Sequence, residues 1–90
     1  MPRTKKDIMR DTNDLRPTVH VGKDGITEGL VSEIKLQLKS NKVVKVRLLP
    51  SAGEDKRSIA EQLASEAGAL LVDARGSVVT LCERKYFAGH

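Results

Sequence analysis

Residues 18–31 read TVHVGKDGITEGLV, and this stretch decides the fold of the chain. Residues 18–21 alternate polar and apolar side chains, which is the pattern of a half-buried strand with Val19 and Val21 inward. A tight turn follows at Gly22–Gly25, and a helical pattern begins directly after it. A strand, a glycine turn and a helix in immediate succession are typical of an α/β protein.

Hydrophobic periodicity predicts the other elements on either side of this stretch. A helix is expected over residues 27–40, because the following apolar residues share one helical face: Ile26, Leu30, Val31, Ile34 and Leu38. Two further helices are expected over residues 4–14 and 54–67, and three further strands over Val43–Leu49, Ala69–Arg75 and Ser77–Glu83. We expect Gly68 to end the last helix and Gly76 to turn the final hairpin.

This order of elements predicts a single-domain α-β-α-β-α-β-β sandwich with a mixed four-stranded sheet. Strand–helix–strand units favour parallel pairing, and the terminal hairpin adds antiparallel pairing. The order of the strands in the sheet does not follow from the pattern. We expect one domain over residues 1–90, with a core at about 4–84 and a tail at 85–90.

Composition indicates a globular protein with an affinity for polyanions. Hydrophobic residues make up 39% of the 90 residues and charged residues 31%, and the longest apolar runs are far too short to span a bilayer. The net charge of +4 favours nucleic acid as a partner. The single cysteine, Cys82, excludes an intramolecular disulfide, and no secretory signal is recognisable. We therefore expect a cytoplasmic monomer that needs no cofactor and contacts no membrane.

The GKDG loop, Gly22-Lys23-Asp24-Gly25, is the main candidate site. Glycines allow a ligand to approach the backbone, and the helix that follows presents free N–H groups and the positive end of its dipole. Lys23 adds a mobile positive charge, so the loop suits a phosphodiester backbone. By itself, a Gly-x-x-Gly segment is more often only a sharp turn, and Asp24 opposes phosphate attraction unless it serves the turn.

Three lysines on the following helix, Lys35, Lys39 and Lys42, lie within a narrow arc, and an extended nucleic-acid backbone could run from the loop along them. A lysine stripe on a helix is usually its solvated face, so this support is modest. The two aromatic residues, Tyr86 and Phe87, lie in the tail, which leaves no stacking platform for bases on the sheet. If RNA is the ligand, its contacts should therefore be mainly through phosphate and sugar.

The segment Leu15–Gly29, LRPTVHVGKDGITEG, resembles the opening of a CRM domain (chloroplast RNA splicing and ribosome maturation). The later elements agree with this resemblance over roughly residues 4–84: Ile34 and Leu38, Val44-Lys45-Val46, Gly68 and Gly76. One departure lies at the last strand, where Leu81 is followed by Cys82-Glu83 instead of the Tyr-Arg pair common in the family.

The resemblance implies a fold similar to the C-terminal domain of translation initiation factor three. It also implies RNA binding in which Gly22, Lys23 and Gly25 take part. Stand-alone prokaryotic members are associated with precursors of the large ribosomal subunit, and plant organellar members promote intron splicing. This chain resembles the stand-alone kind, so ribosomal RNA of the large-subunit precursor is the expected partner.

Other functions find weaker support in the sequence. The basic face could instead meet an acidic protein, or the protein could assist intron splicing. A small hydrolase using Asp73 or His20 has no motif to support it, and we expect Asp73 to face solvent, Cys82 to be a buried thiol and the protein not to be an enzyme. His20 could contact phosphate but is more simply an outward strand residue, and one cysteine with two histidines gives no zinc-ligand spacing.

Overall fold

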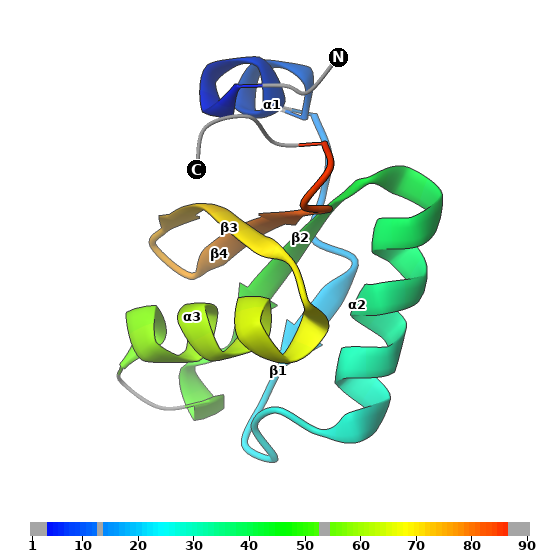
Figure 1. Cartoon of the computed structure of the whole chain (residues 1–90). Coiled ribbons are helices and arrows are strands. Elements are labelled where there is room, and N and C mark those ends of the chain that lie inside the picture. Colours follow the sequence, from blue (N-terminus) through cyan, green and yellow to red (C-terminus); the bar gives the residue numbers. More distant parts are fainter. Residues whose placement is uncertain (1–3, 13, 53–54, 87–90) are drawn as a thin grey trace.

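The computed structural model describes residues 4–12, 14–52 and 55–86 (Figure 1). Along these residues the chain forms α1 (Lys5–Asp11), β1 (Val19–Val21), α2 (Glu28–Asn41), β2 (Val43–Leu48), the 3₁₀ turn η1 (Pro50–Ala52), α3 (Lys56–Ala67), β3 (Leu70–Arg75) and β4 (Val78–Cys82). The predicted order of helices and strands is confirmed, and so is the α/β fold class. None of the helices in these residues has both the length and the apolar character needed to cross a bilayer.

The four strands form one mixed sheet in the order β1-β2-β4-β3. β1 pairs with β2 in parallel, and β4 pairs with both β2 and β3 in antiparallel fashion. The parallel pair and the final hairpin are as predicted, whereas β3 is separated from β2 by β4. Burial agrees with this position, because Val79, Thr80, Leu81 and Cys82 in β4 are all buried, whereas Ala74 and Arg75 at the end of the edge strand β3 are exposed.

Helices α2 and α3 cover one face of the sheet (Figure 1). The predicted inward residues of both helices are buried or half-buried there, against the inward side chains of the strands. The main core consists of Val19, Val21, Ile34, Leu38, Val44, Val46, Leu48, Ala60, Leu63, Ala64, Ala67, Ala69, Val79 and Leu81.

Helix α1 packs on the other face and forms a second, smaller core. Ile8 is 1% exposed there and packs with Val43, Val72 and Cys82. The sequence pattern predicted that face of β2 to carry charge, but its first residue, Val43, is buried under α1. A helix of seven residues is not stable alone, so burial of Ile8 supports it.

Several boundaries differ from the predicted ones for local reasons. Helix α1 was expected over 4–14 but ends at Asp11, because Thr12 caps it and its hydroxyl donates to the Ile8 carbonyl over 2.6 Å. The predicted helix 54–67 is described from Lys56 onward, with Gly53 and Glu54 outside the described residues. Gly68 caps α3 with a positive φ of 64°, and Gly76 turns the hairpin with a φ of 54°, both as predicted.

Candidate nucleic-acid interface

The GKDG loop lies between the end of β1 and the start of α2, at the end of the molecule opposite α1 (Figure 1). The turn is closed by a hydrogen bond in which the backbone N–H of Gly25 donates to the carbonyl of Gly22 over 3.0 Å. Lys23 and Asp24 are exposed at its tip. The structure therefore brings the four predicted loop residues together at one exposed corner.

The two glycines of the loop differ in what the backbone requires of them. Gly25 has a φ of 68°, a conformation that other residues adopt only with strain. Gly22 has no positive φ, and a Cβ added to it would lie at ordinary contact distance, 3.7 Å from Oγ of Ser51 and 3.8 Å from Cδ1 of Leu49. The turn itself needs glycine at position 25, and position 22 could hold a small side chain.

The start of α2 adds backbone donors beside the loop. Thr27 is the N-cap, and its hydroxyl accepts a hydrogen bond from the N–H of Leu30 over 3.2 Å. The N–H groups of Glu28 and Gly29 precede the first intrahelical bond, in which Val31 donates to the Thr27 carbonyl. These two groups face the helix entrance, where the dipole favours an anion, although the Glu28 carboxylate competes for the same position.

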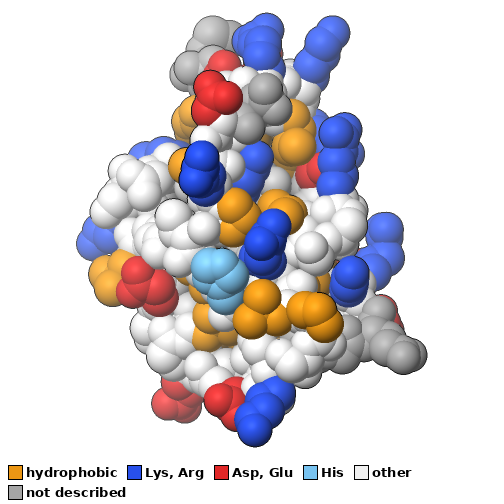
Figure 2. Space-filling model, turned by 180° about the vertical axis from the view of Figure 1, so that it is seen from behind, with side chains coloured by type: hydrophobic (Ala, Val, Ile, Leu, Met, Phe, Trp, Pro, Cys, Tyr) orange, Lys and Arg blue, Asp and Glu red, His pale blue; other side chains and the backbone are white. Residues whose placement is uncertain are grey.

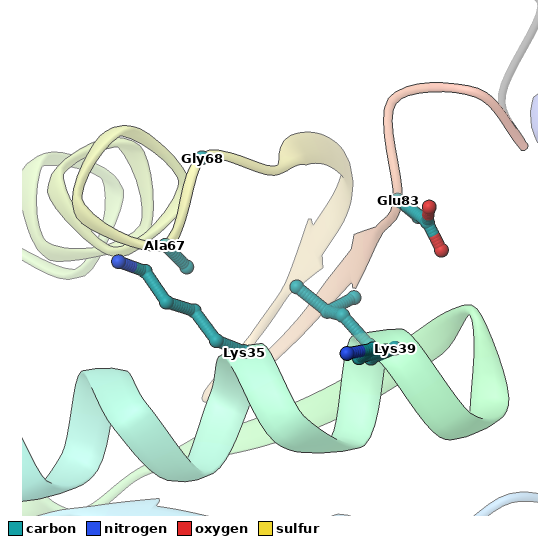
Figure 3. Close-up of a pocket in the computed structure, with 6 residues that line it drawn as sticks. Lys35, Lys39, Ala67, Gly68 and Glu83 are labelled. Carbon is teal, nitrogen blue, oxygen red and sulfur yellow. The ribbon is translucent and has the colours of Figure 1, made fainter.

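Two of the predicted lysines, Lys35 and Lys39, line a hollow of about 210 Å³ between α2 and the end of α3. Figure 3 shows Lys35 reaching from α2 toward the C-terminal end of α3, and Glu83 pointing toward α2. A helix C-terminus carries partial negative charge, and Glu83 adds a full one. One carboxylate and the negative end of a helix dipole therefore line the same hollow as these two lysines.

The third predicted lysine, Lys42, forms the end of helix α2. It is the C-cap of α2 with a φ of 71°, and its backbone N–H donates to the Leu38 carbonyl. Its ammonium lies 3.1 Å from Oε2 of Glu83. The positive charge of Lys42 is thus paired with a carboxylate at the end of β4.

Asp73 and Cys82, which the sequence analysis also considered, have contacts that stabilise the fold. Asp73 was expected to face solvent, but its side chain is only 13% exposed, because Lys5 lies 3.5 Å and Arg75 3.0 Å from its carboxylate oxygens. Cys82 is buried as predicted, and burial, together with the neighbouring Glu83 carboxylate, raises the pKa of its thiol to about 11. Within the described residues, no three His, Cys, Asp or Glu side chains gather as metal ligands do.

Sequence reasoning missed one group of basic residues. Lys45 and Arg47 of β2 and Arg75 of β3 lie on the face of the sheet opposite α2, where α1 leaves part of the surface open. The alternation in β2 pointed Lys45 and Arg47 outward, but only the pairing of strands brings Arg75 next to them. His20, an outward strand residue as predicted, lies on the same face.

Comparisons with known proteins agree with this architecture. The chain is 38% identical over 79 residues to "Probable RNA-binding protein MJ0652" of Methanocaldococcus jannaschii, covering 86% of this chain and 58% of that protein. It is 29% identical over 77 residues to "Probable RNA-binding protein YqeI" of Bacillus subtilis, covering 86% and 80% respectively. The chain thus spans little more than half of the archaeal relative's length.

A solved structure extends the likeness to three dimensions. The solution structure of SAV1595 from Staphylococcus aureus, described as a candidate RNA-binding protein, superimposes with a TM-score of 0.76 at 26% identity and covers 93% of this chain and 90% of that one. The model of the CRS1/YhbY (CRM) domain matches residues 2–82. Since this match includes the strand, the GKDG loop and all the helices, the chain belongs to the CRS1/YhbY (CRM) domain family, as the resemblance of its opening segment predicted.

Proposed function

We propose that this protein binds RNA without catalysing a reaction and that it grips the phosphodiester backbone with Gly22, Lys23, Asp24 and Gly25. The observation that carries the proposal is the exposed corner itself, where a glycine turn with Lys23 at its tip leads directly into the N-terminus of α2. The related proteins of Methanocaldococcus jannaschii and Bacillus subtilis are named as RNA-binding proteins and not as enzymes, which supports RNA binding without catalysis.

The binding mode follows from the chemistry of the corner. The backbone N–H groups at the start of α2 and the Lys23 ammonium suit phosphate oxygens, whereas the described loop offers no aromatic side chain on which a base could stack. Asp24 occupies the turn and limits the net positive charge there. Affinity should therefore depend on backbone shape and fall steeply with added salt, because each phosphate contact releases condensed counterions.

The finer proposal names the RNA and the setting. We propose ribosomal RNA of the large-subunit precursor as the partner, bound in the cytoplasm by a monomer whose single domain has its core at about 4–84. The lysines Lys35, Lys39 and Lys42 extend the contact along α2, with Lys42 contributing least because Glu83 neutralises it. The resemblance to stand-alone members of the family motivates this choice of RNA.

Binding of a structured fragment of large-subunit ribosomal RNA tests the loop. We expect the Gly22→Asp/Gly25→Asp variant to lose most of its affinity, since two carboxylates would then face the phosphates. Lys23→Gln should weaken binding, while Lys56→Gln, which removes an exposed lysine from the first turn of α3, should not. Equal affinity of folded wild type and loop variant would refute the loop assignment.

Sedimentation of a cell extract distinguishes RNA from a protein partner. If the proposal is correct, the protein sediments with ribosomal precursors and returns to the top of the gradient after complete ribonuclease digestion. A complex that survives digestion unchanged would instead indicate an acidic protein bound to the basic face. Sequencing of RNA crosslinked to the protein separates ribosomal RNA from introns.

A further inference from the structure

Part of the sheet remains uncovered on the face opposite α2 and α3. Among the residues that the structure describes, helix α1 packs mainly over the end of the sheet where Val43 and Cys82 lie, and the other end is open. The strand register aligns one residue from each strand in a row across this open part: His20, Arg47, Val78 and Arg75. Figure 2 looks onto the molecule from behind and shows Lys and Arg side chains beside the histidine on this face.

This row is basic and exposed. His20 and Arg47 are exposed, and the side chain of Arg75 is 79% exposed. Strands lie about 4.8 Å apart, so the row from His20 to Arg75 crosses roughly 14 Å of surface. Its cations are thus spread over a length that an extended polyanion can follow, instead of being concentrated at one point.

The neighbouring row on the same face contains Lys45, Thr80 and Asp73. Asp73 is the one carboxylate in the two rows, and two cations partly neutralise it: Arg75 Nε lies 3.0 Å and Lys5 Nζ 3.5 Å from its oxygens. Since the carboxylate is 13% exposed and Arg75 is 79% exposed, an approaching anion meets the guanidinium first. The two rows therefore present a net positive surface.

The open face is concave next to these cations. A hollow of about 280 Å³ is lined by Met9, Lys45, Asp73, Arg75, Val78 and Thr80. Its walls combine the two basic side chains with the Asp73 carboxylate, the largely buried Thr80 and two apolar side chains, so the lining is polar and charged instead of a large apolar anchor site. Protein interfaces are usually centred on aromatic residues, and the residues lining this hollow include none.

The basic row begins at the strand that leads into the GKDG loop. His20 precedes Gly22 by two residues, and the intervening Val21 points into the core. The loop and the row thus meet at the same edge of the sheet. On α2, Lys35 and Lys39 share their hollow with Glu83 and Lys42 is paired with it, just as Lys45 and Arg75 share theirs with Asp73.

We propose that the open face of the sheet is a second RNA-contacting surface, in which Lys45, Arg47 and Arg75 bind phosphates of a strand that continues from the GKDG loop across β1, β2, β4 and β3. The proposal rests on the proposed RNA binding and adds a path for the backbone that differs from the lysines of α2. His20 lies at the junction between the loop and this path.

A charge-matched pair of variants tests the path. Arg47→Gln/Arg75→Gln removes two cations from the open face, and Lys56→Gln/Arg57→Gln removes two from the first turn of α3 on the opposite face. Both lower the net charge equally. For the large-subunit ribosomal RNA fragment, we expect the first variant to bind about tenfold more weakly and the second to bind like wild type. The plot of log affinity against log salt has a negative slope. This slope should become shallower by about 1.4 for the first variant alone, since each lost phosphate contact reduces its magnitude by about 0.7.

Chemical acetylation of the wild-type protein provides a second measurement that needs no variant. With RNA bound, Lys45 should be protected and Lys56 should react as in the free protein, as read by mass spectrometry. Equal affinities of the two folded variants, or unprotected Lys45 in the complex, would overturn the second surface while RNA binding stands. Failure of wild type to bind would instead refute the proposed function.

Discussion

Nζ of Lys42 lies 3.1 Å from Oε2 of Glu83, and the backbone N–H of Glu83 donates to the Lys42 carbonyl over 2.8 Å. These two contacts join the end of α2 to the end of β4, although 41 positions separate the residues in sequence. The backbone of Lys42 has a φ of 71°, a left-handed conformation that is unfavourable in free energy for any residue with a Cβ. Lys42, which the sequence predicted to contact RNA, thus also connects α2 to β4.

Replacing Lys42 should separate the effect of its backbone strain on stability from the effect of its ion pair. Lys42→Gly relieves the backbone strain, worth about 1–2 kcal/mol, and loses an exposed ion pair worth at most about 1 kcal/mol. We expect the free energy of unfolding to rise slightly in urea titrations. Lys42→Gln, which keeps the strain and loses the pair, should be slightly less stable than wild type. A stable Lys42→Gln and a destabilised Lys42→Gly would contradict this explanation.

The two glycines of the GKDG loop should respond differently to alanine. Gly25→Ala forces a side chain into the left-handed region and should lower the free energy of unfolding by about 1–2 kcal/mol. Gly22→Ala makes only ordinary contacts, so its stability should stay within about 0.5 kcal/mol of wild type. If RNA approaches the backbone at Gly22, this stable variant still binds more weakly in an electrophoretic or fluorescence titration. Unchanged binding would argue against close approach at that position.

Gly29 occupies the first turn of α2, where nothing in the fold requires glycine. It has no positive φ, it is exposed, and no atom lies within 4 Å of a Cβ built there. Gly29→Ala should therefore stabilise the protein by about 0.5–1 kcal/mol through helix propensity. We expect RNA affinity to fall nonetheless, because the methyl group would stand between phosphate and the free N–H groups. Ser32→Ala, one turn further along, is the matched control and should bind normally.

The buried thiol of Cys82 makes stability depend on alkaline pH. Its pKa of about 11 in the folded protein lies above the value of about 8.5 for a free cysteine. Between these values the unfolded chain loses a proton that the folded protein keeps, so the free energy of unfolding decreases as pH rises. Its full contribution is present below about pH 8.5. Cys82→Ala should be less stable than wild type at neutral pH. In urea titrations at pH 8, 9 and 10, its free energy of unfolding should decrease less with pH than that of wild type, because it has no thiol to titrate. Parallel pH profiles of the two proteins would show that the thiol does not titrate in this way.

Much of the fold could be predicted because each element carries its own periodicity. Val19 and Val21 alternate with outward residues in β1, and Ile34 and Leu38 share the buried face of α2, so pattern and burial agree. The early end of α1 could not be predicted from periodicity, because it depends on the non-helical backbone conformation of Thr12, the C-cap. The loop residues 22–25 form one exposed corner, and their contact with RNA stays a prediction.

The sequence by itself determined the elements of this protein and the position of its glycine turn, because helix and strand periods and the conformational freedom of glycine are local properties. Only the tertiary structure decided the order β1-β2-β4-β3, because strand pairing depends on contacts between residues that are far apart in the sequence. The same pairing aligned His20, Arg47 and Arg75 in one row and drew Lys42 to Glu83. Charges far apart along a chain become a surface only when strand register brings them together.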